Sequence, residues 1–130
     1  MSVLKIEAKF NEGFKGQLIT KKTAADVGSG EKALAPYDML FGALATCLYS
    51  TFLDVIQKKR ITFESSNVIV TGEKREDIPT TLKWVNVVIE IKDASNEKGI
   101  LKAAELAKKY CSVYETISKV AKMNIEVKFI

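Results

Sequence analysis

The chain has 130 residues, of which 47% are hydrophobic and 28% charged, and its formal net charge is +4. This composition excludes a disordered chain and is typical of one globular domain, which we expect to span residues 1–130. The sequence has no histidine, which excludes Ser-His-Asp and Cys-His catalysis, and its two cysteines are too few to complete a tetrahedral metal site. We therefore expect no metal at the functional site.

Charge patterning argues against nucleic-acid and membrane partners. The short basic runs at residues 21–22, 58–60 and 108–109 are interleaved with acidic residues, which indicates a solvated surface. Charged residues interrupt every apolar run at the N-terminus, so we expect no signal peptide. The uncharged stretch between Asp38 and Asp54 is about 15 residues long, short of the ~20 that cross a bilayer. We expect a cytoplasmic protein, in a reducing compartment where cysteines stay free.

The N-terminal part of the sequence predicts a hairpin and then a loop. Residues 3–10 alternate apolar and charged side chains, as in a half-buried strand. Asn11-Glu12-Gly13 is a turn signal, and residues 14–20 are the expected partner strand. Residues 21–35 are polar and contain glycines, so we expect a loop there.

Residues 36–60 predict a long helix. Pro36 suits the first helical turn, and Asp38 places a carboxylate near the positive end of the helix dipole. Apolar or small side chains then recur at helical spacing, at Leu40, Leu44, Cys47, Leu48, Thr51, Phe52 and Val55. Because nearly every side of its middle is apolar, we expect this helix to be central and wrapped by sheet or by a partner chain.

The remaining sequence predicts two strands, two helices and a final strand. Ser112 to Glu115 has the form of a capping box, so a short helix is expected directly after Cys111. The predicted order is ββ-α-ββ-αα-β, which favours an α+β fold with antiparallel sheet over a parallel α/β fold. These elements are expected at residues 67–71, 81–92, 97–110, 112 onward and 124–130.

The two cysteines are the candidate reactive groups. Cys111 precedes a helix N-terminus, where backbone N–H groups and the dipole lower a thiol pKa. Cys47 lies on the apolar stripe of the long helix, where burial alone would raise its pKa and a cysteine often serves as a small core residue. These considerations by themselves favour Cys111 as the more reactive thiol.

Two motifs carry a resemblance to a known family. From Pro36 to Cys47 the chain has a proline, an acidic residue, a bulky apolar pair, a run of small residues and a cysteine. This segment resembles the helix signature of the OsmC/Ohr family, the osmotically inducible and organic hydroperoxide resistance proteins. Residues 110–117, Tyr-Cys-Ser-Val followed by Tyr-Glu-Thr-Ile, resemble the second motif, usually Cys-Pro-Val and a helix. The order of elements matches too, so the resemblance covers essentially the whole chain.

The resemblance implies both a fold and a reaction. The fold would be OsmC-like, with antiparallel sheets around a long central helix in an intertwined homodimer. Cys47 would be the peroxidatic thiolate that attacks a small organic hydroperoxide in oxidative-stress defence, and Cys111 the resolving thiol that closes a disulfide. An external dithiol would reduce this disulfide, and no cofactor is expected. We follow the family in giving Cys47 the attacking role.

Three positions depart from the family pattern. Tyr37 stands where the well-characterised peroxidases have Glu, and the acidic residue follows as Asp38, about 180° round the helix from Cys47. We expect these two only as supporting site residues. Ser112 replaces the usual proline, which the capping box explains. No arginine precedes Arg60, so the cations available in the N-terminal region are lysines such as Lys15, Lys21, Lys22 and Lys32.

Two alternative functions follow from these departures. The chain would be a non-peroxidatic OsmC-like protein that binds an apolar ligand or partner at its dimer interface, or a redox sensor with Cys111 as its sole reactive thiol. The first alternative requires a pocket, and the aromatic residues available to line it are Tyr37, Phe41, Tyr49, Phe52 and Trp84.

Overall fold

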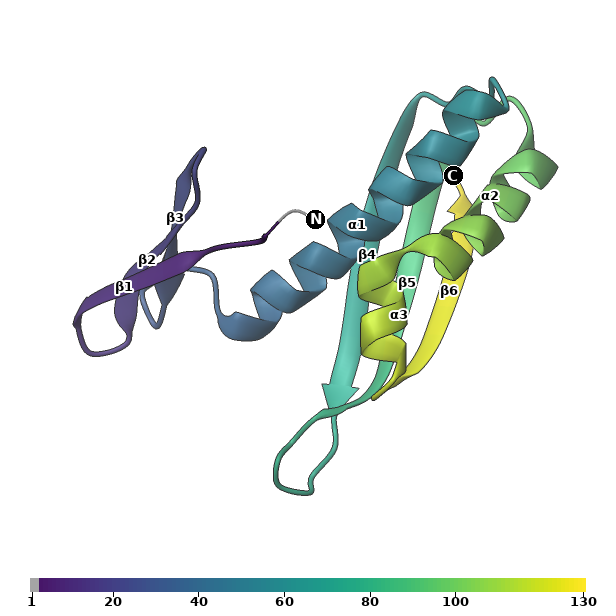
Figure 1. The fold of residues 1–130 in the computed structure, drawn as a ribbon. Helices are drawn as coiled ribbons and strands as arrows, with labels where there is room; N and C mark the ends of the chain where they lie inside the picture. Colours follow the sequence, from purple (N-terminus) through teal and green to yellow (C-terminus); the bar gives the residue numbers. More distant parts are fainter. Residues whose placement is uncertain (1–2) are drawn as a thin grey trace. The chain divides into compact units, whose positions relative to one another are not determined.

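The computed structural model describes residues 3–130, whose nine helices and strands are shown in Figure 1. Contacts gather these residues into two compact units, one ending at Leu40 and the other spanning Phe41–Ile130. The single domain expected over residues 1–130 stays a prediction. The elements are β1 (Glu7–Glu12), β2 (Lys15–Ile19), β3 (Ala24–Gly28), α1 (Pro36–Lys58), β4 (Ser65–Lys74), β5 (Leu82–Lys92), α2 (Glu97–Tyr110), α3 (Ser112–Ser118) and β6 (Lys122–Phe129).

The N-terminal unit is a three-stranded antiparallel sheet in the order β1-β2-β3. The predicted hairpin is confirmed, with Glu7 opposite Ile19. The loop predicted over residues 21–35 is wrong at β3, which pairs with β2 from Ala24 to Gly28. This strand is short and lacks strict alternation, so its pairing depends on the free edge of β2. Gly28 has φ 111°, and a Cβ there would collide with the Phe14 carbonyl oxygen.

Helix α1 has 23 residues and begins at Pro36, as predicted. The Asp38 carboxylate accepts a hydrogen bond from the Ala35 N–H at 2.8 Å, which satisfies one of the free donors at a helix start. By length and composition alone α1 would also pass for a membrane-spanning helix. In the structure it buries one stripe of side chains at i, i+4 spacing, as a core helix does, consisting of Leu44, Leu48, Phe52 and Ile56.

The second sheet has the order β4-β5-β6 and is mixed. Strands β4 and β5 are antiparallel, with Ser65 opposite Lys92, whereas β5 and β6 are parallel, with Trp84 beside Lys122. The α+β class is confirmed, but the expectation of purely antiparallel sheet is wrong for this pair. Helices α2 and α3 lie between the two strands in sequence and return the chain to the end where β5 began, as a parallel pair requires.

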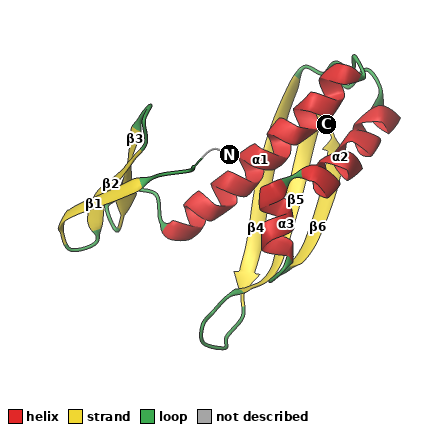
Figure 2. Cartoon of the chain, viewed as in Figure 1, coloured by secondary structure: helices red, strands yellow, loops and turns green. Residues whose placement is uncertain are grey.

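Helices α1, α2 and α3 all lie on one face of this second sheet, as the red and yellow elements in Figure 2 show. The inward face of β5, consisting of Val85, Val87, Ile89 and Ile91, has no solvent exposure. It packs with the buried stripe of α1 and with Ile100, Ala103 and Ala107 of α2. Each fully buried aliphatic side chain of this kind contributes about 1.5–3 kcal/mol through the hydrophobic effect. This core holds α1 and the α2–α3 junction in fixed positions.

Candidate functional site

The structure brings Cys47 and Cys111 together, although they are 64 positions apart. The Cys111 thiol donates a hydrogen bond to the Cys47 sulfur, with 3.1 Å between the two Sγ atoms. Both are free thiols; Cys47 is half-buried and Cys111 is buried. Because a disulfide has an S–S distance of about 2.05 Å, closing one here requires the sulfurs to approach by only about 1 Å.

Cys47 is held by the middle of α1, where the backbone is fully hydrogen-bonded. Its neighbours Leu44 and Leu48 belong to the buried stripe and have no exposed surface, so the Cys47 side chain sits at the edge of that stripe. The Thr51 hydroxyl also donates to the Cys47 carbonyl at 3.1 Å. The backbone of the nucleophile candidate is therefore held within a helix, while the residue itself is only half-buried.

Cys111 forms the junction between α2 and α3. Its N–H donates to the Ala107 carbonyl at 2.8 Å, and its own carbonyl accepts from the Glu115 N–H at 3.0 Å. Its sulfur accepts from the Tyr114 N–H at 3.4 Å, so Cys111 itself is the N-cap of α3. The helix starts where it was predicted, but the capping box is wrong. Glu115 pairs with Lys119 at 2.8 Å rather than reaching back to Ser112.

The surroundings of Cys47 lower the pKa of its thiol. Partial burial raises this pKa, but hydrogen bonds to the sulfur outweigh it; the donors are the Val113 backbone, the Cys111 thiol, and the side chain and backbone of Ser112. These groups stabilise the thiolate by donating to its negative charge. The residues that lower this pKa thus belong to the junction of α2 and α3, whereas Cys47 lies on α1.

Burial raises the pKa of the Cys111 thiol, and its hydrogen bond to the negatively charged Cys47 sulfur raises it further, while the Tyr114 N–H opposes both. The expectation that the helix N-terminus makes Cys111 the more acidic thiol is therefore wrong. The physical reason is that Cys111 is buried and donates its proton to the Cys47 sulfur, which favours the charged form of Cys47 and disfavours that of Cys111. Cys47 is therefore the more acidic thiol of the pair, and Cys111 is the donor in the hydrogen bond between them.

The predicted supporting residues lie at the far end of α1. Asp38 binds the Ala35 N–H, and Tyr37 is half-buried in the same first turn. Asp38 precedes Cys47 by nine residues on this helix, which is about 14 Å along the axis at 1.5 Å per residue. The supporting role expected of Tyr37 and Asp38 stays a prediction. The residues that sequence reasoning missed are Ser112 and Val113, and the available signal was their position directly after a cysteine at a helix start.

A groove of about 410 Å³ runs between α1 and β4. The Ser66 hydroxyl donates to the Tyr49 hydroxyl at 2.8 Å across these two elements. Of the five aromatic residues predicted to line a pocket, Tyr49 lines this groove, whereas Phe52 lies in the core with no exposed surface. The complete lining is Ala45, Thr46, Tyr49, Ser50, Leu53, Ser66, Asn67 and Val68.

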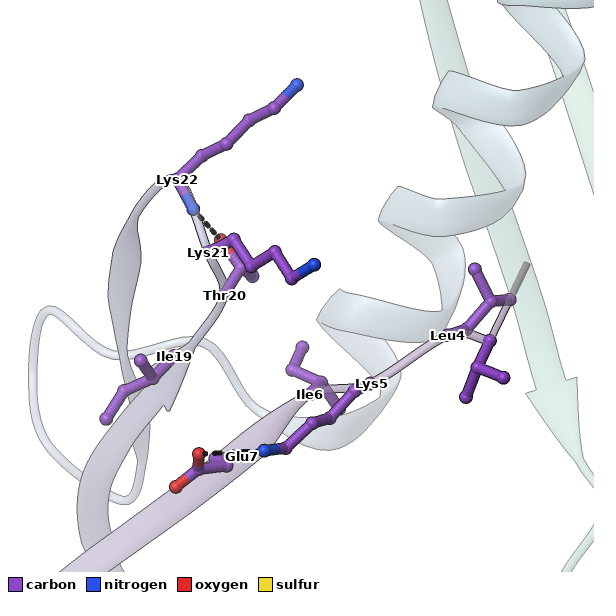
Figure 3. A pocket seen from close by; sticks show the side chains of 9 residues that line it. Leu4, Lys5, Ile6, Glu7, Ile19, Thr20, Lys21 and Lys22 are labelled. Carbon is purple, nitrogen blue, oxygen red and sulfur yellow. Dashed lines mark hydrogen bonds and ion pairs between the residues drawn. The ribbon is translucent and has the colours of Figure 1, made fainter.

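A hollow of about 730 Å³ lies within the N-terminal unit, between residues 3–7 and 19–22 (Figure 3). Figure 3 shows Lys5 paired with Glu7, at 3.6 Å, and the side chains of Lys21 and Lys22 extending from the turn after β2. Two of the four lysines considered as cations for the thiolate thus line this hollow. Its lining contains no thiol, so we assign no chemistry to it.

The sequence of this chain is similar to a known family and to a known protein. The family model of OsmC-like proteins matches residues 28–126, a range that includes both cysteines. Protein YhfA of Escherichia coli K12 is 30% identical over an alignment of 99 residues, and the match covers 72% of this chain and 72% of YhfA.

Solved structures with the same fold cover the chain almost completely. The OsmC like protein from Mycoplasma pneumoniae has a TM-score of 0.88 at 23% identity, and the match covers 99% of this chain and 98% of that one. OhrB of Bacillus subtilis, an organic hydroperoxide resistance protein, has a TM-score of 0.72 at 14% identity, covering 98% of this chain and 100% of OhrB. Together with the family match, these structures confirm the OsmC-like fold. The chain therefore belongs to the family of OsmC-like proteins.

Proposed function

We propose that this chain is a thiol-dependent peroxidase that reduces organic hydroperoxides through Cys47 and Cys111. The observation that carries the proposal is the pair itself, with a 3.1 Å contact in which Cys111 donates to Cys47. The opposite directions of the two pKa changes support a division of roles, a thiolate at Cys47 and a thiol at Cys111. The resistance to organic hydroperoxides named for OhrB, which shares the fold, supports the choice of substrate class.

The first step is attack by the Cys47 thiolate on the distal oxygen of the hydroperoxide. A sulfur–oxygen bond forms, the oxygen–oxygen bond breaks, and Cys47 becomes a sulfenic acid. The leaving alkoxide takes a proton from solvent and departs as an alcohol. Cys47 is suited to this step because the residue is only half-buried, whereas Cys111 is buried.

The second step is attack by Cys111 on the oxidised sulfur of Cys47. The Cys111 proton leaves with the sulfenic hydroxyl group as water, and one disulfide forms. The starting distance of 3.1 Å means that no large movement of the backbone is needed. An external dithiol then reduces the disulfide by thiol–disulfide exchange, which returns both thiols and requires no bound cofactor.

We also propose that the functional form is a homodimer. Among the described residues of the N-terminal unit, Val27 is the one buried hydrophobic side chain, and every residue of β1 is exposed. A unit of fewer than about 40 residues rarely stabilises itself without such a core. Helix α1 is apolar along its length, yet only 22% of its most apolar segment is buried. A second copy of the chain would cover these surfaces, and light scattering would then give twice the mass of one chain.

The test is a thiol count on reduced protein before and after one equivalent of cumene hydroperoxide, with mass spectrometry to locate the product. We expect both thiols to disappear and one Cys47–Cys111 disulfide to form in each chain. In Cys111→Ser, Cys47 should stop at a sulfenic acid that dimedone traps, whereas Cys47→Ser should not consume hydroperoxide. Two intact thiols after several minutes with hydroperoxide would contradict the proposed activity.

The groove between α1 and β4 supports a second candidate function, the binding of an apolar ligand. Its volume of about 410 Å³ is within the range of small-molecule pockets, about 300–1,000 Å³, and Leu53 and Val68 give it an apolar wall. A screen of apolar compounds by thermal shift would test this function. A hit whose shift disappears in Leu53→Asp, in a protein that does not react with hydroperoxide, would establish binding in place of catalysis.

A further inference from the structure

The two free thiols form a pair whose sulfurs are held close together by different helices. Cys47 lies in the middle of α1 and Cys111 at the junction of α2 and α3, with 3.1 Å between the two Sγ atoms. Cys111 has no exposed surface, and Ala107 and Tyr114 beside it in the two helices are buried as well. Because packing in one core sets the positions of both cysteines, the pair is a preorganised ligand with two sulfur donors.

The separation of the two sulfurs selects the geometry of an atom that could bind to both. Two bonds of about 2.3 Å, the length of a zinc–thiolate bond, place their sulfurs about 3.3–3.8 Å apart when the angle between the bonds is about 90–110°. This is only about 0.2–0.7 Å more than the 3.1 Å found here. A linear arrangement would need about 4.6 Å between the sulfurs. The pair therefore fits a pyramidal or tetrahedral centre better than a linear one.

The number of ligands selects further among such centres. The sequence has no histidine, and nowhere in residues 3–130 do three Cys, Asp or Glu side chains lie together in a way that could hold a metal ion. A zinc ion takes four ligands, so the protein would supply only half of them. A trivalent arsenic atom that carries one organic group is pyramidal and needs only two more ligands. Its adduct with two thiols is also uncharged, so burying it beside Cys111 requires no neighbouring cation.

We propose that the Cys47–Cys111 pair binds monosubstituted trivalent arsenicals, R–As(OH)2, through both sulfurs. Two arsenic–sulfur bonds form, two arsenic–oxygen bonds break, and the two thiol protons leave with the hydroxyl groups as two molecules of water. Arsenic stays trivalent and neither sulfur is oxidised, so the step needs no oxidant or reductant. Cys47 reacts first because it is only half-buried, and Cys111 then closes the ring. The inference does not rest on the proposed peroxidase function, although the adduct would block it.

The test uses phenylarsine oxide as the probe on the full-length reduced protein, followed by native mass spectrometry and a thiol count. We expect one adduct in each chain and the loss of both free thiols. An excess of the dithiol dimercaprol should release the adduct, whereas glutathione at the same thiol concentration should not, because it offers single thiols against a preorganised pair. Wild-type protein that keeps both thiols in the presence of the probe would refute the proposal.

Cys47→Ser and Cys111→Ser each remove one of the two sulfur ligands. We expect either variant to bind phenylarsine oxide at least about 100-fold more weakly than the wild type, as the loss of one of two linked contacts implies. Ser118→Ala is the matched control, because it removes from α3 a hydroxyl that donates to the Glu115 carbonyl at 2.6 Å and leaves both thiols in place. It should bind as tightly as the wild type.

Two results would overturn the arsenical site. One is binding by either cysteine variant that is as tight as that of the wild type, and the other is a single arsenical shared between two chains. Consumption of cumene hydroperoxide, measured on the same preparation, separates this inference from the proposed function. Tight binding by a protein that consumes no hydroperoxide would support the arsenical site and refute the peroxidase, whereas hydroperoxide consumption by a protein that binds no arsenical would do the reverse.

Discussion

The hydrogen bond between the two thiols predicts how substitutions at Cys111 change the reactivity of Cys47. Cys111→Ala removes a donor that lies 3.1 Å from the Cys47 sulfur. A hydrogen bond to a charged group contributes about 1.5–3 kcal/mol, and the lower end applies because Cys47 is only half-buried. A loss of about 1.5 kcal/mol means roughly tenfold less thiolate at a pH below the ionisation of Cys47.

The direction of the pH dependence follows from the pKa of Cys47, which is lower in the folded chain than that of an ordinary thiol. Removing one donor moves this pKa back upward, so the loss of thiolate appears at neutral and acidic pH and disappears at alkaline pH. Cys111→Ser retains a donating hydroxyl and the ability to cap α3, so its alkylation rate should stay close to that of the wild type. Neither variant can close the disulfide.

The assay is the pseudo-first-order rate of Cys47 alkylation as a function of pH, with melting temperatures to confirm that both variants fold. We expect Cys111→Ala to be about tenfold slower than Cys111→Ser at neutral pH. In the wild type, Cys47 should be alkylated well before Cys111, which is buried and has a raised pKa. Equal rates for the two variants, or labelling of Cys111 first, would refute the reasoning; the second result would favour Cys111 as a redox sensor.

Three further predictions concern stability, each measured by urea unfolding at one protein concentration. Gly72→Ala should lower the free energy of unfolding by about 1–3 kcal/mol. A Cβ at this position would lie 2.7 Å from Phe41 Cζ and 3.0 Å from the Trp84 carbonyl oxygen. A variant as stable as the wild type would show that Phe41 moves freely. Asn96→Ala should lower the free energy of unfolding by about 1 kcal/mol, because the Asn96 side chain caps α2 by accepting from the Gly99 N–H at 2.9 Å. Lys98→Ala in the same turn serves as the comparison. Tyr114→Phe should leave the free energy of unfolding unchanged or raise it by about 1 kcal/mol, because the Tyr114 hydroxyl is buried without a hydrogen-bond partner among the described residues. A clear loss of stability would reveal a partner in the assembled protein.

Local pattern in the sequence was sufficient for the long, strongly periodic elements. Helix α2 begins and ends where its amphipathic pattern predicts, and α1 ends two residues before the predicted Arg60. Strand β5 agrees to within one residue, because eleven residues of alternating side chains leave little ambiguity. The two cysteine motifs were also readable in sequence, and the family they indicated is the one to which the chain belongs.

Tertiary structure decided what depends on residues far apart in sequence. The pairing of β3 with β2 and the parallel pairing of β6 with β5 arise from free strand edges and from the path of α2 and α3, which no local pattern records. The acidity of the two thiols was decided in the same way. The sequence placed Cys111 at a helix start, but only the fold shows that Cys111 is buried and that its thiol donates to Cys47, 64 positions away. A pKa depends on the groups around a sulfur in space, and here those groups come from a different helix.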